Sequence, residues 1–337
     1  MENISSDTLY PVTDHFDGAH FYNVNTDFKG RNKLLDVLQW KLKGGATKWP
    51  CKTKNSTIPE LPNSVGEHEA FITFINHATH LVQLEGLNII TDPIFSKRVS
   101  PVSWLGPKRV RPPGIVFESL PKIDIVVISH NHYDHMDLPS IRMLWKRDAP
   151  LFIVPLGNGK QLEAEGVSRI IELDWWQTHS LNTFQSITLT PAQHWSGRTP
   201  FDHCKTLWGG YLITSKHLKI FFAGDTGYNN HFQEIRRRYG KMDISILPIG
   251  AYEPRWFMQK QHMNPSEAIQ THIDLGSKLS IGTHFGTFQL ANEGFNDPVQ
   301  HLREHLTLLN IEYTQFIAPE HGQTISYIHI VNEELGT

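Results

Sequence analysis

Residues 123–137 read IDIVVISHNHYDHMD, a strand-like run followed at once by four side chains that can bind a metal ion. The run 123–128 has β-branched residues at nearly every position, which predicts a buried β-strand. The candidate ligands follow it directly: His130, His132, Asp134 and His135. Alternate residues of a strand end share a face, and the turn that follows brings Asp134 and His135 to a neighbouring position. One tetrahedral ion does not readily accept all four ligands, whereas two adjacent ions share them.

Three more predicted strands end in a residue that can bind a metal ion. These residues are His194 in PAQHW, Asp225 in FFAGDTG and His284 in IGTHFG. The carboxyl ends of strands are where α/β sheets place their sites. A His-rich surface turn and isolated structural histidines are the alternative reading. Four such strand ends in one chain favour a metal centre instead.

Composition agrees with this reading and excludes several others. The chain has 337 residues, 20 histidines, 2 cysteines and a net charge of −3. Histidine is the commonest metal ligand in proteins. Two cysteines cannot build a disulfide framework or a multi-cysteine zinc site. The slight negative charge argues against nucleic acid as a partner. The polar N-terminus and the absence of a long apolar run predict a cytoplasmic protein.

The chain divides into an irregular segment and a regular α/β part. We expect residues 1–66 to form an N-terminal extension that packs on the core, and residues 67–337 to form the hydrolase domain. Strands are predicted at 71–75, 80–84, 87–90, 123–128, 152–154, 187–189, 208–214, 218–222, 244–248, 279–282 and 324–330. Helices are predicted at 32–42, 138–147, 231–239, 265–275 and 297–309. Hairpin-like strands followed by alternating strands and helices predict a layered α/β protein with mixed sheets.

These motifs resemble the metallo-β-lactamase superfamily. The motif H-x-H-x-D-H, followed by a His, an Asp and a His, carries the likeness. The motifs SHNHYDH, ELDWW, AQHW, FFAGDTGY, LPIGAYEPRWFM and HFGTF closely resemble the N-acyl-phosphatidylethanolamine-hydrolysing phospholipase D family, in its bacterial branch. The resemblance extends over about residues 70–324.

The resemblance implies an αββα sandwich of two mixed sheets flanked by helices, with two zinc ions per chain. His130, His132 and His194 would hold the first ion, and Asp134, His135 and His284 the second, with Asp225 bridging the two. Iron or manganese would also suit these donors. The implied reaction is hydrolysis of N-acyl-phosphatidylethanolamine to N-acylethanolamine and phosphatidic acid by a hydroxide that bridges the zinc ions. Asp134 or Asp225 would orient that hydroxide or accept its proton.

Further residues are candidates for contacts with the substrate. His321 matches a histidine that the family places near the phosphate, and it is also the candidate to protonate the leaving alcohol. Gln261 and His262 precede a helix whose Asn264 forms a cap, near the positive end of the helix dipole. Tyr133, inside the ligand loop, is a candidate donor to a phosphate oxygen. His77 and His80 either support the ligands or are merely structural.

Two patterns outside the ligand set have competing interpretations. The motif H-x-x-E-H at 301–305 spells an inverted zincin signature, but we interpret it as the solvated face of a helix. The aromatic residues Trp40, Trp49, Trp104 and Phe257 could form an interfacial surface, but we interpret scattered aromatic residues of this kind as ordinary packing.

The predicted partners are a phospholipid or other phosphodiester substrate, the surface of a membrane as a peripheral contact, and a second copy of the chain in a homodimer. Two other functions remain open. One is hydrolysis of another phosphodiester, an ester or a lactone by the same fold. The other is a metal-binding scaffold without catalysis, against which the complete set of seven ligands argues.

Overall fold

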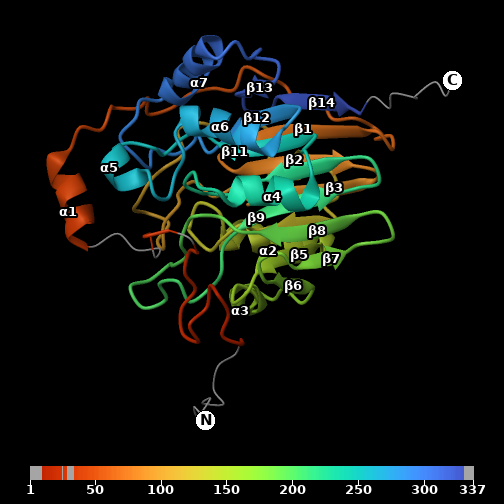
Figure 1. The fold of residues 1–337 in the computed structure, drawn as a ribbon, viewed down its shortest axis with the longest axis horizontal. Coiled ribbons are helices and arrows are strands. Elements are labelled where there is room, and N and C mark those ends of the chain that lie inside the picture. The colour runs from red at the N-terminus through yellow and green to blue at the C-terminus, as the bar shows by residue number, and fades with distance from the viewer. Residues whose placement is uncertain (1–9, 25, 29–33, 330–337) are drawn as a thin grey trace.

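The computed structural model describes residues 10–24, 26–28 and 34–329. It contains two seven-stranded sheets that face each other and carry helices on their outer faces (Figure 1). The predicted αββα sandwich of two mixed sheets is therefore confirmed.

The first sheet has the strand order β14-β1-β2-β3-β4-β5-β6. Its strands are β1 (Glu69–Asn76), β2 (Thr79–Leu84), β3 (Leu87–Thr91), β4 (Ile125–Val127), β5 (Leu151–Pro155), β6 (Ile170–Leu173) and β14 (Thr324–Ile328). Pairing is antiparallel from β14 to β3 and parallel from β3 to β6. The single turn Glu85-Gly86 joins β2 to β3, as the sequence predicts.

The second sheet repeats this plan with the order β13-β12-β11-β10-β9-β8-β7. Its strands are β7 (Thr178–Ser180), β8 (Ser186–Thr190), β9 (Gly210–Thr214), β10 (Lys219–Phe222), β11 (Ile244–Pro248), β12 (Leu279–Thr283) and β13 (Phe316–Ile317). Pairing is antiparallel from β7 to β10 and parallel from β10 to β13. Parallel strands end at the same edge, so β10 and β12 deliver their final residues to one place.

Helices cover both outer faces. The helices are α1 (Leu34–Lys43), α2 (Leu138–Asp148), α3 (Gly159–Ala164), α4 (His231–Tyr239), α5 (Arg255–Met258), α6 (Pro265–Leu275) and α7 (Asp297–Leu308), with a 3-10 turn at Phe117–Ser119. Apolar residues of α2 and α3 pack on the first sheet, and those of α4, α6 and α7 pack on the second. The largest apolar cluster fills the space between the sheets. Helices α1 and α5 lie together at the left of Figure 1, beyond one end of both sheets.

Short elements account for most differences from the sequence-based prediction. The predicted strand 123–128 is shorter, as β4. The prediction omitted five short elements of two to six residues, namely α3, α5, β6, β7 and β13. Helix α6 begins as predicted: the Asn264 side chain accepts a hydrogen bond from the Glu267 backbone N–H, and Glu267 returns one to the Asn264 backbone. This capping box fixes the start of the helix that follows Gln261 and His262.

Candidate metal centre

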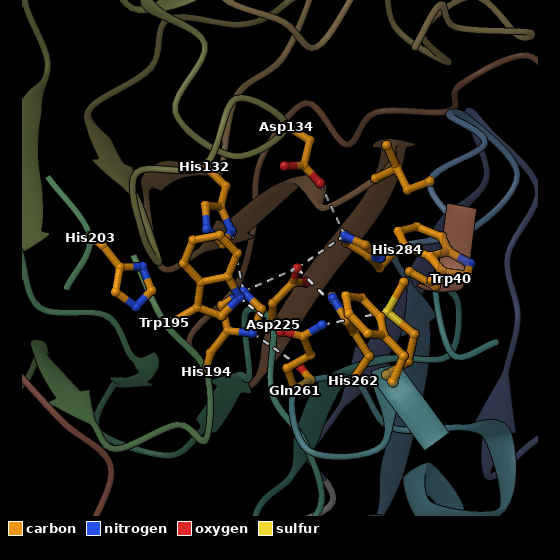
Figure 2. Close-up of a pocket in the computed structure, with 14 residues that line it drawn as sticks. Trp40, His132, Asp134, His194, Trp195, His203, Asp225, Gln261, His262 and His284 are labelled. Carbon is orange, nitrogen blue, oxygen red and sulfur yellow. Dashed lines mark hydrogen bonds and ion pairs between the residues drawn. The ribbon is translucent and has the colours of Figure 1, made fainter. Parts of the chain in front are cut away.

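The seven predicted ligands converge at one edge of the sandwich. His130, His132, Asp134 and His135 follow β4, His194 follows β8, Asp225 follows β10, and His284 follows β12. Each side chain stands just past the carboxyl end of a buried strand, so the sheets hold the ligands at fixed positions. Figure 2 shows several of them around a common centre.

One group of ligands consists of His130, His132 and His194. The distance between His130 Nε2 and His132 Nδ1 is 2.8 Å, and that between His194 Nε2 and His132 Nδ1 is 3.3 Å. Ring nitrogens about 2.0–2.1 Å from one tetrahedral zinc ion have a similar spacing. Burial, followed by the charge of neighbouring histidines, lowers the pKa of His130 and of His132 well below the usual value. Both rings are therefore neutral at pH 7 and present the lone pairs that a metal ion needs.

The second group consists of Asp134, His135 and His284. Asp134 Oδ2 lies 3.4 Å from Nε2 of His135 and 3.4 Å from Nε2 of His284. Asp225 lies between the two groups: its Oδ2 is 3.1 Å from His135 Nε2, 3.2 Å from His284 Nε2 and 3.9 Å from His194 Nε2. This arrangement places one carboxylate where two adjacent cations would share it.

Charges in this part of the site are strongly coupled. Burial alone would raise the pKa of Asp134 and of Asp225, but the positive charge of His135 holds both pKa values well below normal. Burial would likewise lower the pKa of His284, but the charge of Asp225 and a hydrogen bond with Asp134 raise it to about 9. Both carboxylates are thus ionised and draw positive charge to this side of the site. Divalent cations would supply that charge in place of protons on the imidazoles.

The polar atoms at the centre fit this interpretation. Within the described part of the chain, His135 Nε2 and Asp225 Oδ1 are buried and make no hydrogen bond of acceptable geometry. Unsatisfied polar atoms in a protein interior are destabilising unless a further partner is supplied. The donor types, imidazole nitrogen and carboxylate oxygen, suit zinc, iron or manganese.

Asp92 supports the ligands from behind, and the sequence analysis did not identify it. The side chain of this residue is fully buried just after β3, and its Oδ2 accepts hydrogen bonds from His135 Nδ1 (2.6 Å) and from Ser129 Oγ (2.6 Å). Its Oδ1 accepts a third from the Ser129 backbone N–H at 2.7 Å. Such a carboxylate fixes the tautomer of a ligating histidine, so that the other ring nitrogen faces the metal. Its position directly after a predicted strand was the available signal.

His77 has the same kind of role toward Asp134. His77 Nε2 is 2.9 Å from Asp134 Oδ2, and its ring lies 4.0 Å from the ring of His284. The His77 carbonyl accepts hydrogen bonds from the His284 backbone N–H and from Thr283 Oγ1. His77 therefore ties the end of β1 to the end of β12. Of the two roles that the sequence left open for this residue, these contacts favour support of the ligands.

Hydrogen bonds from Asn23 in the N-terminal segment fix the backbone of His194. The Asn23 side chain donates a hydrogen bond to the His194 carbonyl (2.8 Å) and accepts one from its backbone N–H (3.1 Å). The Gln261 carbonyl lies 3.0 Å from His194 Nδ1 and accepts its proton, which leaves Nε2 for a metal ion. Residues far apart in sequence thus fix the orientation of this one ring.

A cavity of about 390 Å³ opens over the ligands. Its polar side includes His132, Asp134, His194, Asp225 and His284. Its apolar side is formed by Trp40, Ala251, Phe257, Met258 and Leu290. Trp40, which comes from α1, stacks on Phe257 with ring centroids 5.0 Å apart. The cavity therefore has the candidate metal ligands on one side and apolar side chains on the other.

The predicted substrate contacts divide into two pairs. Gln261 and His262 line the cavity, and His262 Nδ1 lies 3.8 Å from Asp225 Oδ2. His321 and Tyr133 do not line it. His321 is fully buried, with Nε2 2.8 Å from Thr287 Oγ1, and the Tyr133 hydroxyl donates to the Arg198 carbonyl at 3.0 Å. Both side chains make hydrogen bonds outside the cavity, and their contacts with the phosphate stay predictions from the sequence.

The remaining patterns are structural in the described chain. In the H-x-x-E-H motif, His301 Nδ1 lies 2.8 Å from the Tyr252 hydroxyl, and His305 bonds to the carbonyl of His301 in its own helix. Of the aromatic residues considered for an interfacial surface, Trp49 is buried and donates a hydrogen bond to the Glu293 carbonyl, as the packing interpretation expects. Trp104 is 74 % exposed. None of the described helices has the length and hydropathy needed to cross a bilayer.

Comparisons with known proteins agree with this fold and site. The beta-lactamase superfamily domain matches residues 87–285. The N-acyl-phosphatidylethanolamine-hydrolyzing phospholipase D 1 of Caenorhabditis elegans is 36% identical over 288 residues, which cover 81% of this chain and 81% of that protein. The mitochondrial enzyme of the same name from Saccharomyces cerevisiae is 37% identical over 76% of this chain and 57% of its own.

Among solved structures, a metallo hydrolase from the archaeon Ignicoccus hospitalis superposes with a TM-score of 0.58 at 22% identity. The superposed region covers 77% of this chain and 98% of the archaeal protein, and at this sequence identity the similarity concerns the fold alone. Three observations lead to one conclusion: histidines and aspartates converge at the strand ends, the beta-lactamase superfamily domain matches the chain, and the two phospholipases D are similar in sequence. The chain is a metallo-β-lactamase-fold hydrolase and belongs to the family of N-acyl-phosphatidylethanolamine-hydrolysing phospholipases D.

Proposed function

We propose that this protein is a di-zinc phosphodiesterase that hydrolyses N-acyl-phosphatidylethanolamine to N-acylethanolamine and phosphatidic acid. The observation that carries the proposal is the cavity, in which the ligand side chains and an apolar wall face the same space. A phosphodiester with acyl chains needs both surfaces. The names of the relatives from Caenorhabditis elegans and Saccharomyces cerevisiae support this choice of substrate.

We assign three ligands to each ion and a shared carboxylate to both. His130, His132 and His194 would hold one ion and Asp134, His135 and His284 the other, and Asp225 would be a ligand to both. Two zinc ions at these positions would supply a nucleophile from water at neutral pH and positive charge opposite the phosphate oxygens. In the reaction, oxygen from water adds to phosphorus and the P–O bond to the N-acylethanolamine breaks.

Asp225 is the better candidate to accept the proton of the attacking water. Its Oδ1 is buried, makes no hydrogen bond and belongs to the residue at the centre of the ligand set. Asp134 Oδ2 already accepts a hydrogen bond from His77. A carboxylate with a free oxygen beside the reacting atoms is suited to this role.

His262 is the candidate donor to the substrate oxygens. It lines the cavity beside Asp225 and is not one of the seven proposed ligands. Burial lowers the pKa of His262 to about 3, which keeps the ring neutral. A neutral imidazole still donates one N–H, so we assign His262 a hydrogen bond to the phosphate or to the leaving oxygen. The leaving alcohol would then take its proton from water.

A direct assay tests the substrate. Purified protein is incubated with N-acyl-phosphatidylethanolamine, bis(p-nitrophenyl) phosphate or a lactone, and the products are separated by mass spectrometry. We expect release of N-acylethanolamine from the lipid, lost in Asp225→Asn. Turnover of the lactone but of neither phosphodiester would instead support the alternative hydrolase. The homodimer, the cytoplasmic location and the peripheral membrane contact remain predictions from the sequence.

A further inference from the structure

A second group of histidines lies at the end of the sandwich opposite the metal centre. Glu67 and His68 form the turn that enters β1, and His217 lies in the turn between β9 and β10. β1 leads from this turn to His77 at the metal centre, and an eight-residue strand spans about 26 Å. In Figure 1 this end is on the right, where β14 runs toward the C-terminus, whereas α1 and α5 lie on the left.

The three side chains come within coordinating range of one another. The rings of His68 and His217 have centroids 4.0 Å apart with a 39° angle between their planes. One ligand atom from each of Glu67, His68 and His217 lies within 4.8 Å of the other two. Two imidazoles and one carboxylate form a complete set of protein ligands for an open zinc site, in which water takes the fourth position.

Both turns hold their histidines in place without using the rings. The first turn is closed by hydrogen bonds from the Glu69 backbone N–H to the Gly66 carbonyl (3.2 Å) and from the Gly66 N–H to the Glu69 carboxylate (3.1 Å). The second is closed by a bond from the Ser215 backbone N–H to the Leu218 carbonyl at 2.8 Å. The backbone of each turn is therefore fixed, and little ordering would be needed when an ion binds.

The ring of His68 also contains a polar atom that lacks a partner. His68 Nδ1 is buried and makes no hydrogen bond within residues 10–24, 26–28 and 34–329. Of the neighbouring charges, Lys216 opposes a cation, whereas Glu67 and Glu85 favour one.

We propose that Glu67, His68 and His217 form a separate site for one divalent transition-metal ion, such as Zn²⁺ or Ni²⁺. The ion would join the first sheet to the second at the end remote from the cavity. Its role would be structural, because the three ligands lie outside the cavity lining. The site is independent of the proposed phosphodiesterase activity.

Calorimetric titration with Ni²⁺ tests this site, on tag-free enzyme that has been loaded with zinc and then dialysed against zinc-free buffer until two zinc ions per chain remain. We expect one Ni²⁺ to bind per chain in addition to the resident ions, with no loss of zinc. Affinity should fall at least about tenfold in His68→Gln and in His217→Gln, because each removes one of three ligands. Glu67→Gln, at an exposed position, should weaken binding without affecting folding. His20→Gln, at an exposed histidine elsewhere, is the matched control and should bind like the wild type.

A second measurement separates loss of the site from loss of the fold. Ni²⁺ should raise the unfolding temperature of the wild type and of His20→Gln, but not of His217→Gln. Without Ni²⁺, all these proteins should unfold at the same temperature and hydrolyse substrate at the same rate. The proposal is overturned if the wild type binds no additional ion, or if both histidine variants bind it with unchanged affinity.

Discussion

Asp92 and His77 act on the metal centre without belonging to the proposed ligand set. Asp92 accepts three hydrogen bonds, one of them from His135, and His77 contacts Asp134. Both are fully or almost fully buried, so bulk water cannot replace them. The orientation of the ligands therefore depends on buried residues that a substrate does not touch.

We predict that Asp92→Asn weakens metal binding by about 10- to 100-fold, because the amide is neutral and keeps only one of the two acceptor oxygens that His135 and Ser129 use. Metal content after dialysis against a chelator, measured by elemental analysis, checks this. Asp27→Asn, at an exposed carboxylate, is the control. Equal retention of metal by the wild type and Asp92→Asn would show that Asp92 does not support the ligands.

His262→Ala should lower kcat by about 10- to 100-fold, the usual effect of losing one hydrogen bond to a charged group. Because His262 is not a proposed ligand, the metal content of the variant should remain that of the wild type. His203→Ala is a matched control, since His203 lines the same cavity but lies beyond Trp195 in Figure 2. An unchanged kcat in His262→Ala would rule out the assigned contact.

The positions of single residues were predictable from the sequence where strand ends determine them. His194, Asp225 and His284 lie together because each follows a buried strand, which periodicity reveals. Asp92 follows the same rule but was missed, since one acidic residue after a strand is a weak signal. Tyr133 lies in the ligand loop, yet its hydroxyl donates to Arg198. The direction of a side chain within a loop depends on contacts with residues distant in sequence, so the spacing of residues in the loop does not predict that direction.

At the scale of elements, the long amphipathic helices and hairpin strands were predictable, and the short ones were not. Helix α6 has a capping box and a proline in its first turn, and its bounds agree with the prediction. Helix α3 and strand β7 are too short for periodicity to distinguish them from loops. Both are stabilised mainly by their neighbours, which the local sequence does not specify.

Asn264→Ala should lower the free energy of unfolding by about 1 kcal/mol, because helix α6 loses the side-chain acceptor at its start. Chemical denaturation monitored by circular dichroism measures this. Asn230→Ala is the matched control: Asn230 is the N-cap residue of α4, but its side chain makes no capping hydrogen bond. Equal destabilisation by both substitutions would contradict the assigned cap.

His15 connects the N-terminal segment to the core and makes this contact sensitive to pH. Its ring stacks on Trp175 with centroids 4.5 Å apart, and its nitrogens lie 2.7 Å from Asp174 and 2.6 Å from Asp14. Burial opposes protonation, but the hydrogen bonds and charges of Asp174 and Asp14 raise the pKa of His15 above its ordinary value. The protonated ring is therefore the form that the folded state favours.

A pKa raised in the folded state gives stability that is complete below about pH 6.5 and is lost as the pH rises through the folded-state pKa. His15→Gln should therefore destabilise the protein more at pH 5.5 than at pH 9. The loss of unfolding free energy should be about 1 kcal/mol larger at pH 5.5 than at pH 9. Solvent screening of the exposed Asp14 carboxylate reduces this value. Unfolding curves at the two pH values measure it, with His20→Gln as control. A pH-independent effect would contradict this charge pairing.

At the scale of the whole molecule, the cavity joins parts of the chain that are far apart in sequence. Trp40 comes from α1, Phe257 from α5, and the ligands from the ends of strands in both sheets. The division at residue 66 did not predict that the N-terminal part contributes to the cavity wall. The apolar wall therefore exists only in the complete fold.

Trp40→Ala should raise KM for N-acyl-phosphatidylethanolamine by about tenfold, because a large apolar contact with the lipid is lost. Hydrolysis of bis(p-nitrophenyl) phosphate, which has no acyl chain, should change little. Trp104→Ala, at an exposed tryptophan outside the cavity lining, is the control. Equal loss of both activities in Trp40→Ala would indicate general damage to the site and not a lost lipid contact.

The central claim is that two metal ions share Asp225. Anomalous X-ray diffraction from crystals of the zinc-loaded protein, measured on both sides of the zinc absorption edge, tests it most directly. We predict two anomalous peaks flanking Asp225, one among His130, His132 and His194 and the other among Asp134, His135 and His284. A single peak at this edge of the sandwich, or two peaks that Asp225 does not bridge, would contradict the account.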